Sequence, residues 1–242
     1  MKCMKTVSIS DTHGFLPKIT EPADIMFICG DISPLSIQFN KPAMWEWLTG
    51  DFMNWIKELP VEKVYLVAGN HDAWFEGASE AKKTELMFLS AHKLVYLENS
   101  LVHYIDNEGT SWSIFGTPYC HTFGNWPFMR TDEYMEEKFK EIPDGINFIL
   151  THDTPYDWGG QDQILETVRW SNHRLKHIGN KPLANRLREI QFDWCFHGHI
   201  HSSWHGPETI DDPKAGFVVN VSYCNEDYTG TYDPLYLTHY KK

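Results

Sequence analysis

Short apolar runs recur along the chain and predict a series of β-strands. Each run ends at a polar or turn-forming residue, which is typical of strands that are buried in a sheet. The expected strands are Met4–Ser10, Asp24–Cys29, Lys63–Ala68, Leu94–Leu97, Leu101–Ile105, Trp112–Phe115, Asn147–Thr151, Phe192–Phe196, Phe217–Ser222 and Pro234–Tyr240.

Longer segments between these runs carry apolar residues at helical spacing. Pro60 ends the first of them, and Ser79 and Thr131 stand where N-cap residues belong. The expected helices are Ala43–Glu58, Ser79–Ala91, Thr131–Ile142 and Leu183–Ile190. In the first part of the chain strands alternate with helices, and this order favours an α/β fold with a largely parallel sheet.

Residues 154–180 form a long polar and aromatic stretch in which no strand is expected. Loops of that length are uncommon unless they are functional. No repeat, low-complexity segment or linker divides the chain, so we expect residues 1–242 to form a single domain.

The chain is acidic, with a formal net charge of -12, so non-specific binding of nucleic acid is not expected. The five cysteines are an odd number and include no Cys-x-x-Cys motif. This pattern fits a reducing compartment, and we expect a cytoplasmic protein. No apolar run approaches the ~18 residues that span a bilayer, so no membrane association is expected.

Five short patches of metal-ligand residues lie in order along the chain, and four of them follow an expected strand. They are Asp11-Thr12-His13, Gly30-Asp31, Gly69-Asn70-His71-Asp72, Thr151-His152 and Gly198-His199-Ile200-His201. Open α/β sheets bind ligands beyond the carboxyl ends of their strands, so these side chains are expected to converge. The pairs Asp11/His13 and His199/His201 have i, i+2 spacing, and in extended backbone both members of such a pair point the same way.

The patches supply two carboxylates, one amide oxygen and several imidazoles, which is the ligand mixture of a site for two divalent metals. Two such ions, about 3.5–4 Å apart, clamp a phosphoryl group and lower the pKa of a bound water. The charge of two divalent ions exceeds that of two carboxylates, so the site would attract phosphate even in an acidic chain.

The ordered patches resemble the motifs of the calcineurin-like metallophosphoesterases. The match runs from residue 7 to about residue 222. The segments Ala23–Asp31, Asn54–Pro60, Gly116–Tyr119 and Asn220–Ser222 are similar to the subgroup of small metallophosphoesterase-domain proteins. This resemblance implies an α/β/β/α sandwich of two sheets, with the metal site at the C-terminal ends of the strands.

The resemblance also implies two ligand sets. One metal would be held by Asp11, His13, Asp31 and His201. The second would be held by Asp31, Asn70, His152 and His199, with Asp31 bridging the two. Manganese, iron or zinc is expected, because imidazole suits these ions.

His71 is implied to be a catalytic residue that faces the substrate and protonates the leaving oxygen or stabilises the transition state. An imidazole that titrates near neutral pH suits a general acid. Asp72 is a second catalytic candidate, because its carboxylate is placed to orient His71.

Several other residues have alternative interpretations. Asp153 stands where the subgroup has glycine, and its carboxylate would either support the neighbouring ligand or repel a phosphate. His121 is expected to be structural or to line the rim of the pocket rather than to bind a metal, and His197 is expected to be a hydrogen-bonded strand residue. Each of Trp74, Trp158 and Trp204 follows a ligand motif, and each would either line the mouth of the pocket or pack against the scaffold.

The expected function is hydrolysis of a phosphodiester by attack of a metal-bound hydroxide, with cyclic nucleotides among the candidate substrates. The partner would then be a small phosphoester, a nucleotide included. A phosphomonoesterase or protein phosphatase is the alternative within enzymes. A non-catalytic metal-binding scaffold is the alternative outside them, and the complete set of ligand positions argues against it.

Overall fold

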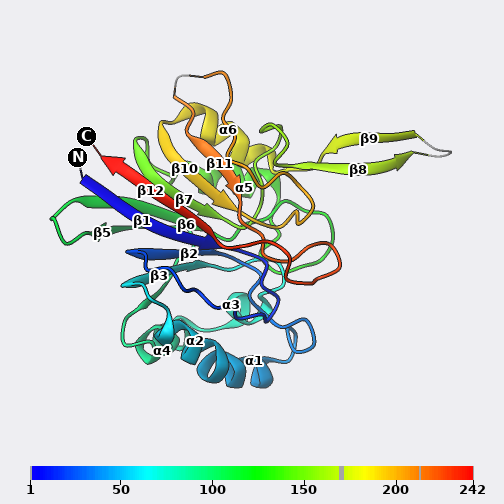
Figure 1. Ribbon diagram of the computed structural model, residues 1–242. Helices are drawn as coiled ribbons and strands as arrows, with labels where there is room; N and C mark the ends of the chain where they lie inside the picture. Colours follow the sequence, from blue (N-terminus) through cyan, green and yellow to red (C-terminus); the bar gives the residue numbers. More distant parts are fainter. Residues whose placement is uncertain (1, 169–171, 213, 242) are drawn as a thin grey trace.

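Two five-stranded sheets packed face to face form the centre of the computed structural model, which describes residues 2–168, 172–212 and 214–241 (Figure 1). One sheet has the strand order β12-β1-β2-β3-β4, and the other has the order β11-β10-β7-β6-β5. Helices cover the outer face of each sheet in Figure 1. The expected α/β/β/α sandwich is therefore confirmed.

Apart from β8 and β9, the observed strands agree closely with the apolar runs. They are β1 (Lys2–Ile9), β2 (Ile25–Cys29), β3 (Lys63–Val67), β4 (Leu94–Tyr96), β5 (Ser100–Ile105), β6 (Ser111–Thr117), β7 (Ile146–Thr151), β8 (Gln163–Val168), β9 (Asn172–His177), β10 (Phe192–His197), β11 (Phe217–Asn220) and β12 (Leu235–Lys241). The central strands β2 and β7 are buried along their whole length, which is why their sequences are continuous apolar runs.

The helices also lie where helical spacing predicts them, with two additions. They are α1 (Lys41–Trp47), the π-helical segment η1 (Leu48–Phe52), α2 (Met53–Glu58), α3 (Ala73–Gly77), α4 (Glu80–Leu89), α5 (Asp132–Phe139) and α6 (Lys181–Glu189). Ser79 and Thr131 cap α4 and α5 as expected, each accepting a backbone N–H with its hydroxyl. The π-helical turn that divides the first expected helix and the short helix α3 were not predicted.

Aromatic side chains from both sheets fill the space between them. The ring of Phe27 on β2 lies 5.3 Å from that of Phe148 on β7 and 5.1 Å from that of Phe196 on β10, measured between centroids. All three side chains are fully buried. Burial of this apolar area is what holds the two sheets together and fixes their relative position.

Parallel pairing brings the ends of the ligand-bearing strands to one edge of the sandwich. β2 is parallel to both β1 and β3, and β7 is parallel to β10. A parallel bridge between Ser10 and Ser222 joins the segments that follow β1 and β11. The five patches of the sequence therefore meet at the same end of both sheets.

The segment 154–180 differs from the expected long loop. Within it, β8 and β9 pair in antiparallel register and form a hairpin that projects from the body of the molecule in Figure 1. Residues 169–171, between the two strands, lie outside the described part of the chain. None of the helices among the described residues combines the length and apolar character needed to cross a bilayer.

Acid should weaken the fold through His239 on β12. Its ring is buried against Phe148, and Thr6 Oγ1 lies 2.9 Å from its Nε2. Burial lowers the pKa of His239 from 6.5 to about 4. Between these two values, the imidazole of His239 is protonated in the unfolded chain but not in the folded chain. The free energy of unfolding is therefore highest above pH ~6.5 and decreases as the pH falls towards about 4.

We expect His239→Gln to flatten the dependence of the unfolding free energy on pH within this window. The difference in slope should reach at most about 1.4 kcal/mol per pH unit, the value for one proton. Urea denaturation of both proteins between pH 4 and 7, with metals chelated, measures it. Equal slopes would show that His239 does not titrate in this way.

Candidate metal centre

The loops that follow β1 and β2 are hydrogen-bonded side by side at the strand ends. The backbone N–H of Asp11 donates to the carbonyl of Gly30 at 2.9 Å, and that of His13 donates to the carbonyl of Asp31 at 2.9 Å. From the other sheet, the N–H of His199 donates to both carboxylate oxygens of Asp11. Backbone contacts thus bring Asp11, Asp31 and His199 together.

Four of the expected ligands have left-handed backbone. The φ angles are 51° at Asp11, 45° at His13, 53° at Asp31 and 71° at His199. The extended i, i+2 geometry expected for Asp11/His13 and His199/His201 is therefore wrong. Non-glycine residues adopt this region rarely, and they cluster at functional sites, where surrounding contacts hold them in place.

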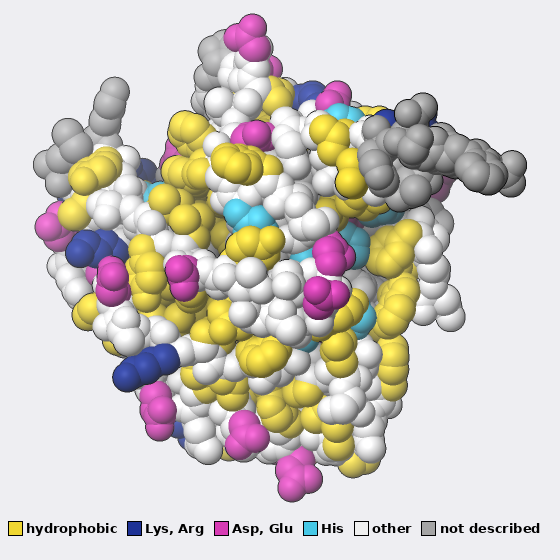
Figure 2. Space-filling view, turned by 45° about the vertical axis from the view of Figure 1, so that its right-hand side comes forward, with side chains coloured by type: hydrophobic (Ala, Val, Ile, Leu, Met, Phe, Trp, Pro, Cys, Tyr) yellow, Lys and Arg dark blue, Asp and Glu magenta, His cyan; other side chains and the backbone are white. Residues whose placement is uncertain are grey.

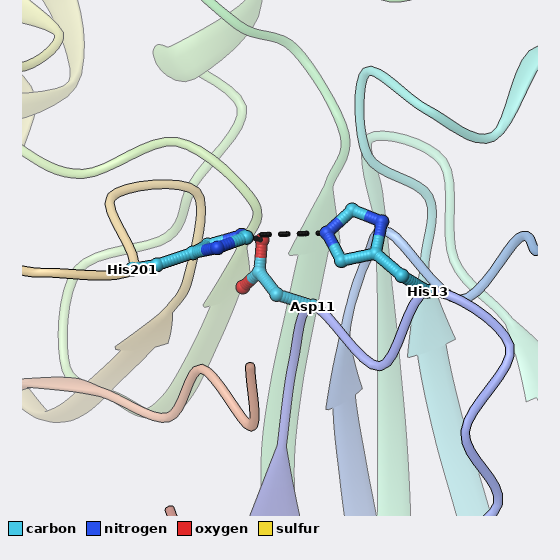
Figure 3. Close-up of side chains that lie close together, drawn as sticks. All are labelled: Asp11, His13 and His201. Atoms are coloured by element: carbon cyan, nitrogen blue, oxygen red, sulfur yellow. Dashed lines mark hydrogen bonds and ion pairs between the residues drawn. The ribbon is translucent and has the colours of Figure 1, made fainter. Parts of the chain in front are cut away.

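One group of potential ligands consists of Asp11, His13 and His201 (Figure 3), whose ligand atoms all lie within 4.8 Å of one another. Nε2 of His201 lies 3.2 Å from Oδ1 of Asp11 and 3.3 Å from Nε2 of His13. Nδ1 of His201 is 2.8 Å from the carbonyl of Asn225, which leaves Nε2 to face the group.

A second group consists of Asp11, Asp31 and His152. Nε2 of His152 lies 3.2 Å from Oδ2 of Asp31 and 3.0 Å from Oδ1 of Asn70. On the other side of the ring, Nδ1 is 2.8 Å from the carbonyl of Cys29. The amide oxygen of Asn70 therefore lies beside this group, and its role as a ligand stays a prediction.

The two groups fit divalent metal ions. Metal-binding histidines usually donate one ring N–H to a carbonyl or carboxylate and bind the ion through the other nitrogen, and both His152 and His201 have this arrangement. The buried Nδ1 of His13 has no hydrogen-bond partner among the described residues. Imidazole and carboxylate donors suit zinc, iron and manganese.

The structure and the family resemblance point to different carboxylates as the one shared by the two ligand groups. The two groups share Asp11, whereas the resemblance implies that Asp31 bridges. His199 belongs to neither group, although its ring lies 5.1 Å from that of His152 and its side chain lines the cavity. A ligand role for His199 remains a prediction.

Burial and neighbouring charge compete at the two best-paired histidines. Burial disfavours the imidazolium of His152, but the carboxylate of Asp31 outweighs this and raises the pKa of His152 to about 10. Asp11 likewise overcomes the burial of His201 and raises its pKa to about 9. Despite their own burial, Asp11 and Asp31 have pKa values well below the usual range, because these histidines lie against them.

The other two histidines behave differently. Burial prevails at His13 and His199 and lowers the pKa of each to about 4. Both rings are therefore neutral near pH 7, and a neutral imidazole is the form that binds a metal.

A cavity of about 230 Å³ opens over the two groups. It is lined by Asp31, Asn70, His71, Phe123, Trp126, His199, His201, Glu226 and Tyr228. Figure 2 shows histidine side chains reaching this face of the molecule among acidic and hydrophobic ones. The lining combines metal-ligand residues, an aromatic rim and one further carboxylate, Glu226.

The aromatic rim does not come from the predicted tryptophans. Trp74 is 6% exposed and stacks on Trp45, and Trp158 is fully buried. Trp204 is 59% exposed but lines a different cavity, beside Gln163 and Tyr232. Residues distant from the ligand motifs in sequence, namely Phe123, Trp126 and Tyr228, line the cavity instead.

His71 lies at the wall of the cavity, beside the second ligand group. Its Nε2 is 3.9 Å from Oδ2 of Asp31, and its ring lines the cavity beside Trp126. Its Nδ1 lies 2.7 Å from Oε1 of Gln38, which is an acceptor only, so this nitrogen carries the hydrogen. Gln38 lies outside all five motifs, and no pattern in the sequence pointed to it.

Asp72 does not orient His71 as the sequence suggested. Its carboxylate is fully buried and accepts backbone N–H groups of Asp31, Ser33 and Gly69 at 2.8–3.0 Å. Burial raises the pKa of Asp72 to about 6, and the nearby charge of Asp31 adds to the effect. Asp72 therefore holds the loop that carries Asp31, and the partner of His71 is Gln38.

Asp153 lies in the interior and is not among the residues that line the cavity. It is fully buried and accepts hydrogen bonds from the backbone and Nδ1 of His121 and from the amide of Asn180. The structural interpretation of His121 agrees with this contact. His197 is also buried, between Thr154 and Gln161, and burial lowers its pKa to about 4.

Comparisons with known proteins agree with this architecture. Metallophosphoesterase domain-containing protein 1 of Homo sapiens is 26% identical to the chain over 245 residues, which cover 95% of this chain and 69% of that protein. The protein of the same name from Mus musculus gives the same values. A crystal structure with 15% sequence identity shares the fold with a TM-score of 0.62, covering 90% of each chain.

The family assignment rests on a match to most of the chain. A family model described as calcineurin-like phosphoesterase matches residues 4–203, which include all five ligand patches. Four of those patches supply the members of the two buried groups described above, and Asn70 of the remaining patch lies beside the second group. The chain therefore belongs to the calcineurin-like phosphoesterase family.

Proposed function

We propose that this protein is a dinuclear metal-dependent phosphoesterase that hydrolyses phosphodiesters. The observation that carries the proposal is the pair of buried ligand groups at the floor of one cavity, with His71 at its wall. A site with this donor set and an adjacent imidazole suits hydrolysis assisted by two metals.

The ligand assignment follows the family pattern. One ion would be held by Asp11, His13, Asp31 and His201, and the second by Asp31, Asn70, His152 and His199. When bound, two such ions supply positive charge to the phosphoryl oxygens and acidify a water. Manganese, iron or zinc fits these donors.

His71 is the proposed proton donor to the leaving oxygen. Because Nδ1 is fixed by Gln38, Nε2, the nitrogen on the side of Asp31, is the one that would deliver a proton, and it would do so from the imidazolium form. Protonation of a leaving oxygen by a placed imidazole typically contributes about 10²–10⁴ in rate.

The charge of the cavity favours a diester over a monoester. Its described lining contains two carboxylates, Asp31 and Glu226, and no lysine or arginine. A monoester dianion has one more negative charge than a diester and gains more from a basic side chain, which this wall does not offer. Phe123, Trp126 and Tyr228 offer planar surfaces on which a nucleobase can stack, so cyclic nucleotides are included in the proposed class.

The proposal also covers the domain organisation of the chain and its cellular compartment. Residues 1–242 would act as a single domain, since the site draws residues from both sheets. Free thiols at all five cysteines support a reducing compartment, and we propose the cytoplasm.

Parallel assays of an aryl phosphodiester and an aryl phosphomonoester, with Mn, Co, Ni, Zn or Mg, test the proposed reaction. We expect hydrolysis that depends on added metal and a higher kcat/KM for the diester. Absence of hydrolysis with every metal would contradict the proposed function.

Replacement of Glu226 tests the effect of the cavity charge on substrate preference. The variant Glu226→Gln removes the charge but keeps an oxygen for the N–H of Ser202, which donates to Oε1 at 2.8 Å. This variant should raise kcat/KM for the monoester several-fold and change kcat/KM for the diester less.

Replacement of His71 tests the proton donor. We expect His71→Ala to retain the metal content of the wild type and to lose about 10²–10⁴ in kcat, because the ligand groups remain intact. Gln38→Leu should cause a smaller loss, since the imidazole remains but is no longer held. Metal analysis and steady-state kinetics measure both variants, and wild-type turnover by His71→Ala would remove the assigned role.

The bridging carboxylate is tested by a matched pair of variants. If Asp31 contacts both ions, Asp31→Asn should deplete both sites, whereas Asp11→Asn should retain the ion beside His152. Metal content per chain after gel filtration measures the difference. The opposite outcome, with Asp11→Asn losing both ions and Asp31→Asn one, would assign the bridge to Asp11.

A further inference from the structure

The loop that follows β11 brings a tyrosine over the metal centre. The ring of Tyr228 makes edge contacts with His13 and His201, with centroids 4.8 Å and 5.4 Å apart, and faces His71 at 6.2 Å. Its side chain lines the cavity and is 40% exposed. Tyr228 therefore lies among three histidines of the site while remaining open to a ligand.

Tyr228 is held there in an unfavourable backbone conformation. Its φ is 56°, in the left-handed region that bulky residues rarely adopt. Such a conformation persists only where surrounding contacts impose it.

Asn225 imposes this conformation. Its Oδ1 accepts the backbone N–H groups of Asp227 and Thr229 at 3.0 Å and 3.1 Å, and the hydroxyl of Thr229 at 2.9 Å. Its carbonyl accepts the N–H of Tyr228 at 2.9 Å. The same carbonyl lies 2.8 Å from Nδ1 of His201. One residue thus fixes both a metal-ligand histidine and the loop that carries Tyr228.

Tyr228 and His71 lie close together at the cavity wall. His71 lies beside Asp31 of the second ligand group and edge-on to His13, with ring centroids 5.0 Å apart. Tyr228 packs on the same His13 ring and also on His201 of the first group. A phosphoryl group that faces both ligand groups would therefore lie near both side chains. With no lysine or arginine in the described lining, a phenol hydroxyl is a donor available to the phosphoryl oxygens.

We propose that Tyr228 is a further catalytic residue, whose hydroxyl donates a hydrogen bond to a non-bridging oxygen of the phosphoryl group. The proposal rests on the proposed phosphoesterase function. It gives the loop of residues 225–230 a double role, since Asn225 orients His201 and places the donor against the same substrate. No covalent bond to Tyr228 is involved.

Tyr228→Phe tests the proposal, because it removes only the hydroxyl and keeps the ring and its backbone conformation. Tyr232→Phe is the matched control, since Tyr232 follows the same loop but stacks on His205 and lines another cavity. Three quantities are measured on manganese-loaded protein: kcat with an aryl phosphodiester, the Kd of inorganic phosphate by calorimetry, and the manganese content.

We expect Tyr228→Phe to lose about tenfold to a hundredfold in kcat and to bind phosphate about tenfold more weakly, with unchanged manganese content. Tyr232→Phe should match the wild type in all three measurements. If the wild type is active and Tyr228→Phe equals it in kcat and phosphate affinity, the inference is wrong and the proposed function stands. If the wild type hydrolyses no ester, the proposed function fails, and the effect of Tyr228→Phe on phosphate affinity still decides whether Tyr228 contacts phosphate.

Discussion

Two buried carboxylates, Asp11 and Asp31, are the constraint around which the site is built. They are 0% and 2% exposed, and both belong to one ligand group, so each charge must be compensated inside the protein. An uncompensated buried charge costs several kcal/mol. His152 and His201 provide part of that compensation, and their raised pKa values show how strongly the carboxylates attract positive charge. Divalent cations bound in the same place would also compensate the charges of the two buried carboxylates. The electrostatics of the fold therefore favour metal binding at this site.

Glycines let the backbone approach these carboxylates closely. A Cβ at Gly69 would collide with the carboxylate of Asp31, and one at Gly198 would collide with that of Asp11. Asp72 holds the Asp31 loop by accepting its backbone N–H groups, and the hydroxyl of Ser222 donates to Oδ2 of Asp11 at 2.8 Å. This close approach explains the glycine that precedes Asn70 and the glycine that precedes His199.

The sequence predicted the described strands except β8 and β9, and it predicted that the five patches converge, because apolar runs and the polar residues that end them are local signals. The aromatic rim was not predictable in this way. Trp74, Trp158 and Trp204 follow ligand motifs, and their sequence positions left open whether they line the cavity mouth or pack against the scaffold; Trp126 and Tyr228 from separate loops line it instead. Gln38 likewise reaches His71 from a loop with no motif of its own. Left-handed backbone at Asp11 and His199 is imposed by contacts between loops and leaves no periodicity to detect.

The central claim is that one cavity holds two metal ions that share a carboxylate. A crystal structure of manganese-loaded protein, with anomalous data collected near the manganese edge, tests it most directly. A dinuclear site predicts two anomalous peaks about 3.5–4 Å apart, one beside His201 and one beside His152, with Asp31 between them. A single peak, or peaks away from these histidines, would contradict it.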